Sequence, residues 1–162
     1  MNVRSALPQS LVLVAFALTP LTVAAQGVPK RQIEIVHYGE DAIGEQIAYR
    51  LRDNFRSSAS FEVVPASGLF RLYITSVDAN PRSPNQVSMY AVVLTMQQEN
   101  AEAFYTQGYI TSLVASCGVG QIGACAEDLY NKSAAEAELA LEDIADAVNA
   151  DMQRRFREAL GN

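Results

Sequence analysis

The stretch Cys117-Gly-Val-Gly-Gln-Ile-Gly-Ala-Cys125 separates a strand-rich part of the chain from a helical part. It holds the only two cysteines of the sequence, with seven residues between them. We expect these cysteines to form a disulfide that closes a corner between the last strand and the C-terminal helix. The chain-entropy model assigns about 2–3 kcal/mol of stabilisation to a loop of this size.

Within this stretch, Gly118-Val-Gly-Gln-Ile-Gly123 has the letters of a dinucleotide-binding fingerprint. That fingerprint needs a βαβ unit, with a second parallel strand and an acidic residue about 20 residues further on. Only helix is expected after Cys125, so we predict no nucleotide cofactor. We interpret the glycines as residues that permit a tight turn.

The residues after the cysteines have the strongest helical pattern of the chain. Ser133-Ala-Ala-Glu136 fits the capping box that begins a helix, and residues 126–131 predict a separate helical turn before it. An apolar stripe then follows at helical spacing: Leu141, Ile144, Val148, Met152, Phe156 and Leu160. We expect this amphipathic helix to pack on a sheet.

The residues before the cysteines predict strands. Segments 69–77, 86–97 and 103–116 alternate apolar and polar side chains and are joined by polar connections, which indicates an antiparallel meander. A first strand is expected over 32–38 and a short second strand over 61–64.

A first helix is expected between these two strands. Acidic residues at Glu40 and Asp41 suit a helix start. The apolar stripe that follows repeats every four residues: Ile43, Ile47, Leu51 and Phe55. The predicted order is therefore β-α-β-β-β-β-α. This is an α+β fold with an antiparallel or mixed sheet of four to five strands and two amphipathic helices packed on it.

The N-terminus predicts export. Arg4 is followed by an apolar run from Leu11 to Leu21 and by small residues up to Ala25, which is typical of a secretory signal peptide. We expect residues 1–25 to be removed and residues 26–162 to form one domain in the periplasm or outside the cell, without a membrane span. The formal net charge of −6 argues against nucleic acid and anionic lipid as partners.

Two segments resemble a recurring part of certain periplasmic α/β domains. They are Gly44-Glu-Gln-Ile-Ala-Tyr-Arg-Leu-Arg-Asp-Asn-Phe55 and Ser58-Ala-Ser-Phe-Glu-Val-Val64. The domains are those like the amino-terminal domain of the translocation protein TolB, in which a helix meets a Ser-rich bend and a Phe-x-Val-Val strand. The resemblance implies a domain that contacts other envelope proteins, and it carries over no functional residue.

Few residues predict chemistry. His37 is the only histidine and could act as a general base with Glu40 or Asp41, although a structural histidine and a helix cap explain the same residues. One histidine and two bonded cysteines leave too few ligands for a zinc site. We therefore predict no catalytic residue, no cofactor and no metal.

Aromatic residues offer a candidate binding surface. Four of them fall on the predicted meander: Tyr73, Tyr90, Tyr105 and Tyr109. They could form an exposed patch that a partner covers, or they could cap the core under a helix. We expect a non-catalytic binding or assembly module of the cell envelope that contacts another envelope protein. The alternatives are a small enzyme that uses His37 and a small-molecule carrier with a pocket between sheet and helix.

Overall fold

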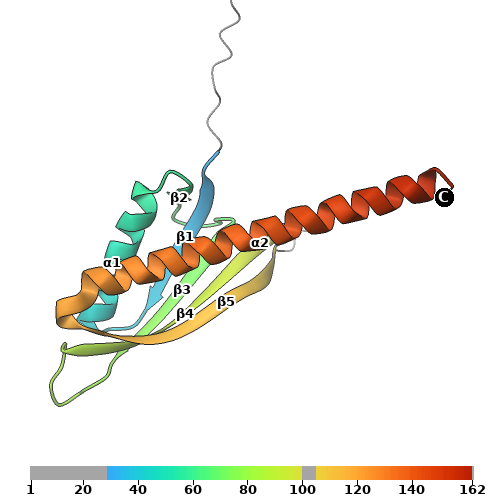
Figure 1. The fold of residues 1–162 in the computed structure, drawn as a ribbon. Coiled ribbons are helices and arrows are strands. Elements are labelled where there is room, and N and C mark those ends of the chain that lie inside the picture. The colour runs from blue at the N-terminus through green and yellow to red at the C-terminus, as the bar shows by residue number, and fades with distance from the viewer. Residues whose placement is uncertain (1–28, 100–104, 162) are drawn as a thin grey trace, which may run out of the picture.

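The computed structural model describes residues 29–99 and 105–161 (Figure 1). The expected signal peptide over residues 1–25 lies outside these ranges, as do residues 100–104. The elements follow the predicted order: β1 (Arg31–Tyr38), α1 (Ala42–Ser57), β2 (Phe61–Val63), β3 (Phe70–Asp78), β4 (Val87–Glu99), β5 (Tyr105–Gly118) and α2 (Ile122–Ala159).

The five strands form one mixed sheet with the order β2-β1-β3-β4-β5. β1 is parallel to both β2 and β3, and α1 makes the connection from β1 to β2. β3, β4 and β5 are antiparallel, which confirms the predicted meander. The α+β fold expected from the sequence is therefore confirmed.

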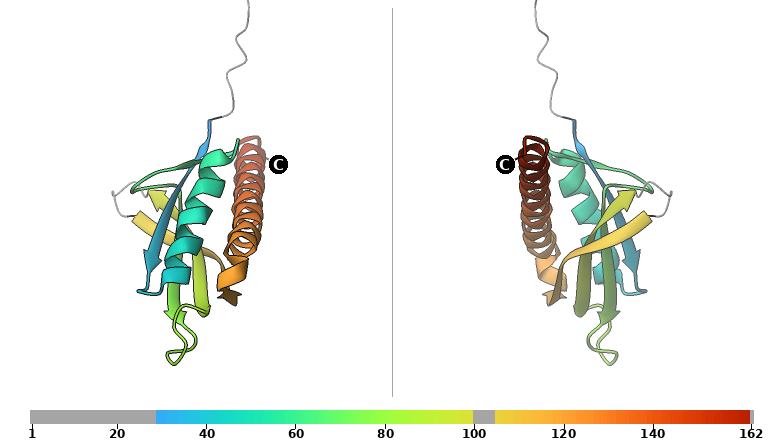
Figure 2. Two further views of the ribbon diagram at one scale, coloured as in Figure 1. Left: turned by 90° about the vertical axis from the view of Figure 1, so that its left-hand side faces the viewer. Right: turned by 90° about the vertical axis from the view of Figure 1, so that its right-hand side faces the viewer.

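Both helices cover the same face of the sheet (Figure 2). On β3, Phe70, Leu72 and Ile74 point into the core, whereas Arg71 and Tyr73 lie on the opposite face. The register places Leu72 opposite Leu94 of β4, so the same alternation continues across the meander. One face of the sheet is thus buried, and the described residues place no helix on the other.

An aromatic cluster connects the helices to the sheet. Phe55 of α1 is fully buried, with its ring centroid 5.2 Å from that of Phe61 on β2 and 4.8 Å from that of Tyr130 on α2. Both contacts are edge-to-face, the geometry that aromatic pairs favour. Phe61 also contacts Phe70 of β3. These rings join α1, α2, β2 and β3 into one core.

The start of α1 is built tightly onto β3. Asp41 is the N-cap, and its Oδ1 accepts a hydrogen bond of 2.7 Å from the backbone N–H of Gly44. Gly39 has a φ of +145°, and a Cβ at Gly44 would lie 1.9 Å from the Ser76 hydroxyl. Both glycines are therefore required, because the backbone passes directly over Ser76.

The predicted helix start at Ser133 is wrong. α2 is one continuous helix from Ile122 to Ala159, and Ser133 lies inside it, 2% exposed. Small or apolar residues recur along its sheet-facing side: Ile122, Ala126, Leu129, Ser133 and Ala137. Ser133 belongs to this face, where a small residue lets the helix approach the sheet, so its side chain serves packing and not capping.

The apolar stripe of α2 packs on the sheet only in part. Leu141 and Ile144 are half-buried, but Val148, Met152, Phe156 and Leu160 are between 51% and 66% exposed. The helix of 38 residues is about 57 Å long, and it extends beyond the sheet (Figure 1). The expectation that the whole stripe covers the sheet is therefore wrong for its C-terminal half.

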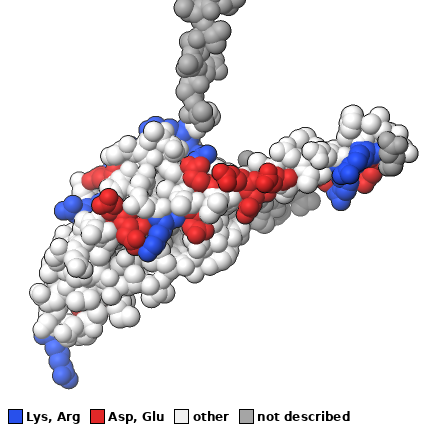
Figure 3. Space-filling model, viewed as in Figure 1, with Lys and Arg blue, Asp and Glu red and all other residues white. Residues whose placement is uncertain are grey.

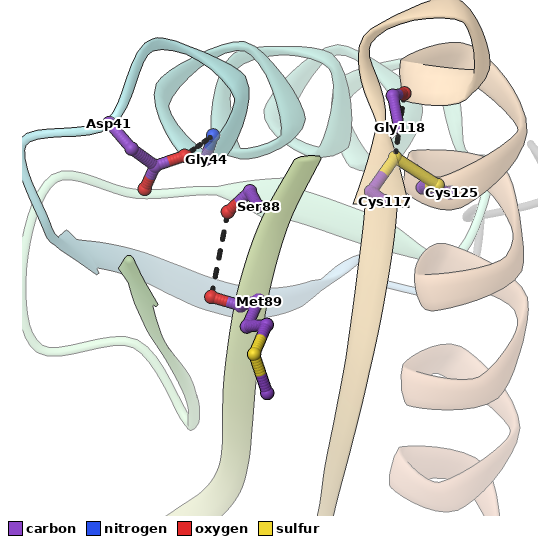
Figure 4. Close-up of a disulfide and its surroundings, with 7 residues drawn as sticks. All are labelled: Asp41, Gly44, Ser88, Met89, Cys117, Gly118 and Cys125. Carbon is purple, nitrogen blue, oxygen red and sulfur yellow. Dashed lines mark hydrogen bonds between the residues drawn. A yellow bond between two sulfur atoms is a disulfide. The ribbon is translucent and has the colours of Figure 1, made fainter. Parts of the chain in front are cut away.

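The disulfide between Cys117 and Cys125 is confirmed (Figure 4). It joins the end of β5 to the first turns of α2 across a single 3-10 turn, Val119–Gln121. Only Gly39 and Gly161 have a positive φ among the glycines that the structure describes, and a Cβ at Gly120 would meet nothing within 4 Å. The glycines of this corner are thus not needed for its turn, contrary to our interpretation.

Candidate functional site

The sheet face without helices carries a group of exposed apolar and aromatic side chains, which we call the open face. Five of its large residues are exposed: Tyr38 of β1, Val77 of β3, Met89 of β4, and Tyr109 and Val114 of β5. The last two are the most exposed, at 67% and 75%. Such a group on one surface is typical of a protein-binding site.

The middle of the open face is fixed by a small ion-pair cluster. Arg71 pairs with Glu34 at 2.6 Å, and both side chains are mostly buried. The guanidinium of Arg71 also donates a hydrogen bond to the Tyr73 hydroxyl and lies 5.8 Å from the centre of that ring. Tyr73 in turn stacks on Tyr38, with 6.4 Å between the ring centroids. These contacts hold the rings of Tyr38 and Tyr73 in place.

The structure does not bring the four candidate tyrosines together. The strand register places Tyr73 and Tyr109 on the open face, and Tyr109, beside the register shift of β5, also lines a hollow next to α2. Tyr90 lies under α2 and is 4% exposed. Burial raises the pKa of Tyr90, and the nearby Asp128 carboxylate raises it further. Tyr105 belongs to β5, but its side chain is outside the part of the chain that the structure describes.

Sequence reasoning missed Tyr38. The signal was present, because Ile33 and Ile35 face the core and the alternation of β1 then places residues 34, 36 and 38 on the other side. Tyr38 is the last residue of this strand. Its stack on Tyr73 depends on the parallel pairing of β1 with β3, which the sequence did not predict.

One edge of the sheet adds to the open face. β5 pairs with β4 on one side only, so its other side presents backbone N–H and C=O groups without a strand partner. Exposed edge strands are usually shortened, or protected by charged residues, proline or a β-bulge. β5 has 14 residues without a charged residue or proline, but its register with β4 shifts between Leu94 and Thr95. The part of this edge beyond the shift, from Thr111 to Gly118, is therefore the part suited to pairing with an added strand.

His37, which is partly buried, belongs to a polar cluster at the carboxyl end of β1. Its Nε2 lies 2.8 Å from the Ser76 hydroxyl. Burial lowers the pKa of His37, and the opposing effect of the Asp41 carboxylate does not offset it. Burial also raises the pKa of Asp41, but the neighbouring donors, the Ser76 hydroxyl first, bring it below its usual value. Asp41 Oδ2 is buried without a hydrogen-bond partner.

This cluster closes the β1–α1 turn onto β3. Ser76 is 2% exposed, and Gly39 and Gly44 pack directly against its hydroxyl. A hollow of about 510 Å³ lies alongside and is lined by Asp41 and Ser76, but His37 does not line it. The contacts of the Ser76 hydroxyl with His37 and with the backbone at Gly39 and Gly44 fix the β1–α1 turn on β3.

The hollows between α2 and the sheet bear on the carrier alternative. One, of about 240 Å³, has Val92, Leu94 and Leu113 in its wall and Lys132 and Glu136 beside them. The next, of about 460 Å³, runs from Met96 along β5 to Ile144 of α2. Both are open to solvent, whereas carriers enclose most of the ligand surface.

Two further properties concern metals and membranes. Over residues 29–99 and 105–161, no three His, Cys, Asp or Glu side chains gather closely enough to hold a metal ion. Within the same ranges, no helix is both long and apolar enough for a membrane crossing.

Comparison with known proteins gives little further information. No family model and no curated protein matches the sequence. Among solved structures, the hypothetical protein CT253 from Chlamydia trachomatis is similar with a TM-score of 0.42 and 8% sequence identity, over 68% of this chain and 96% of that protein. At this level the similarity carries no conclusion about function.

Proposed function

We propose that this chain is an exported, non-catalytic protein-binding module of the cell envelope. Its open face and the adjoining edge of β5 contact another envelope protein. The observation that carries the proposal is the sheet face without helices, with exposed Tyr38, Met89, Tyr109 and Val114 beside an edge strand that has no charged residue and no proline.

The chemistry of this surface selects a protein partner. Large aromatic side chains contribute most of the binding energy in many protein interfaces, because they bury much area and lose little conformational freedom. Tyr38 and Tyr73 are already stacked, so a partner need not order them. The formal net charge of −6 disfavours nucleic acid. The partner that fits best offers an extended segment that pairs with β5 and continues the open face.

Two features of the chain support export. The N-terminal residues have the pattern of a signal peptide. The two cysteines form a disulfide, a bond that persists in oxidising compartments such as the periplasm. The resemblance of residues 44–64 to TolB-like domains, which contact other envelope proteins, agrees with this assignment.

The test is affinity capture of the tagged protein from gently cross-linked envelopes. Tyr109→Ser and Val114→Asp change the open face at its two most exposed positions. Tyr49→Ser is the matched control, because Tyr49 is 61% exposed on α1, on the other side of the molecule. We expect one envelope protein to be recovered with the native chain and the control but lost with both open-face variants. Equal recovery with all four proteins, or none with the native chain, would refute the proposal.

A further inference from the structure

The hollow of about 240 Å³ between α2 and the strands β4 and β5 is a small apolar pocket, which we call the edge pocket. It exists because α2 carries small side chains on its sheet-facing side here, at Ser133 and Ala137, so the helix does not fill the space above the sheet. Its wall includes side chains of both strands and of α2: Val92, Leu94, Thr111, Leu113, Ser133 and Glu136.

The edge pocket opens toward the unpaired side of β5. Glu138 of α2 pairs with Arg31 of β1, so that side of the helix faces β1 and α1. Glu136 comes two residues earlier, about 200° around the helix, and therefore lies on the opposite side, toward β5. A segment that adds to the free edge of β5 runs along the mouth of the pocket.

The backbone of β5 determines how such a segment binds. The N–H of Val119 donates to the carbonyl of Gln86, so beyond the register shift the odd-numbered residues of β5 direct their N–H and C=O groups to β4. Ser112, Val114 and Ser116 then present these groups to the free edge, and all three residues are exposed. Side chains of an added strand also alternate, so every second one points to the α2 side, where the pocket lies.

The size of the edge pocket fits one side chain. A closed apolar cavity of about 150 Å³ holds a benzene molecule, so about 240 Å³ with one open side accommodates a large aliphatic or aromatic side chain. Pockets for small molecules generally measure about 300–1,000 Å³ and enclose most of the ligand. The edge pocket is therefore better matched to one residue of a bound segment than to a free small molecule.

The charge beside the edge pocket is negative. Glu136 also borders the adjoining hollow, together with Asp143 further along α2. Lys132 at the pocket already pairs with Asp128 at 2.7 Å, whereas neither Glu136 nor Asp143 forms an ion pair with another residue in the ranges 29–99 and 105–161. Acidic side chains gather along this part of α2 (Figure 3). The pocket therefore favours a partner segment that carries a basic side chain.

We propose that the edge pocket selects the segment that pairs with β5. The pocket takes one large apolar side chain, and Glu136 pairs with a Lys or Arg two positions away, because alternate residues of a strand lie on one side, about 7 Å apart. The other side of the segment continues the open face beside Val114, which is 75% exposed, and carries apolar or β-branched residues. This inference rests on the proposed function and adds the sequence that the partner must offer.

The first test selects peptides of about ten residues from a random phage-displayed library, with the purified exported protein as bait. We expect enrichment of sequences with a basic residue two positions from a large apolar one. Thr111→Phe fills the pocket and should weaken binding of the enriched peptide at least about tenfold. Thr75→Phe is the matched control at an exposed position of β3 and should leave the Kd within about threefold. Peptides without the pattern, or equal binding by both variants, would overturn the proposal.

A second pair of variants tests the charge. Glu136→Lys should weaken binding of the same peptide about 3–10-fold, because it places like charges together at the mouth of the pocket. Glu142→Lys is the matched control, because Glu142 is exposed on the same helix and borders neither hollow. Equal binding by these two variants would overturn the role of Glu136.

Amide hydrogen exchange shows where the peptide lies. The N–H groups of Ser112, Val114 and Ser116 should exchange quickly in the free protein and become protected by the peptide; unchanged exchange would overturn pairing at this edge. Affinity capture from envelopes separates this inference from the proposed function, because Thr111→Phe should lose the envelope protein as Val114→Asp does. Recovery with Thr111→Phe but not with Val114→Asp would leave the binding module intact and overturn the edge pocket.

Discussion

Removal of the Cys117–Cys125 disulfide should lower the free energy of unfolding without changing the fold. The two cysteines are eight positions apart in sequence, and the bond closes the corner between β5 and α2. A loop of this size gives about 2.5 kcal/mol in the chain-entropy model, because the bond restricts the unfolded chain. That is a large fraction of the roughly 5–15 kcal/mol expected for a domain.

Two forms of the protein separate the cross-link from the sulfur atoms. Reduced native protein loses the cross-link but keeps both side chains, so it should lose about 2.5 kcal/mol. The double variant Cys117→Ala/Cys125→Ala should lose about 1 kcal/mol more, because Cys117 is fully buried and alanine leaves a gap.

The assay is urea unfolding followed by far-ultraviolet circular dichroism, with the slope m rising when the cross-link is lost. A reduced protein within about 0.5 kcal/mol of the oxidised one would refute the reasoning. It would show that the bond does not restrict the unfolded chain as the chain-entropy model assumes.

Three further outcomes are expected, each measured by urea unfolding. Gly44→Ala should destabilise the protein by about 1–3 kcal/mol although alanine favours helix, because its Cβ would clash with Ser76. Adding Ser76→Gly should restore part of this loss. A Gly44→Ala protein as stable as the native one would contradict the packing described. Burial lowers the pKa of His37, so its contribution to stability is complete above the ordinary pKa of 6.5 and is lost as pH falls below it. Between about pH 7.5 and pH 5.5 the native protein should therefore lose more free energy of unfolding than His37→Gln. An equal loss of stability in both proteins over this range would contradict the prediction. A double-mutant cycle with Phe55→Leu and Tyr130→Leu should give a coupling of about 0.5–1.5 kcal/mol, whereas additive losses would mean that the ring contact contributes nothing.

The strands and the first helix could be predicted because each has one buried face and one exposed face. Phe70, Leu72 and Ile74 alternate with polar residues, and a period of two is enough to place them in the core. The apolar stripe from Ile43 to Phe55 predicted α1 for the same reason, at helical spacing. The disulfide was predictable from the export that the N-terminal sequence indicates and from the short spacing between Cys117 and Cys125.

The wrong predictions concern features that depend on how the elements pack, which the spacing of apolar residues along the chain does not specify. The stripe of α2 shows which side is apolar, but not that the sheet ends near Ile144 and leaves Phe156 in solvent. Ser133 has the letters of a cap, yet only the packed structure shows that it faces the sheet. The four tyrosines looked alike, and Tyr90 differs from Tyr109 only in the face to which its strand position assigns it.

The contact between His37 and Ser76 joins residues 39 positions apart. It depends on the parallel pairing of β1 with β3, and alternation alone does not specify which strands pair or in which direction. The candidate site was therefore predictable as a set of strand tyrosines, but its membership required the three-dimensional register.

The most direct measurement of the proposed function is site-specific photo-cross-linking in the intact envelope. A photoreactive phenylalanine analogue replaces Tyr109 on the open face in one strain and Tyr49 on α1 in another; both positions are exposed aromatics, at 67% and 61%. We predict a cross-link to one other envelope protein from position 109 and none from position 49. Absence of a cross-link at position 109, or the same products from both positions, would contradict a partner on the open face.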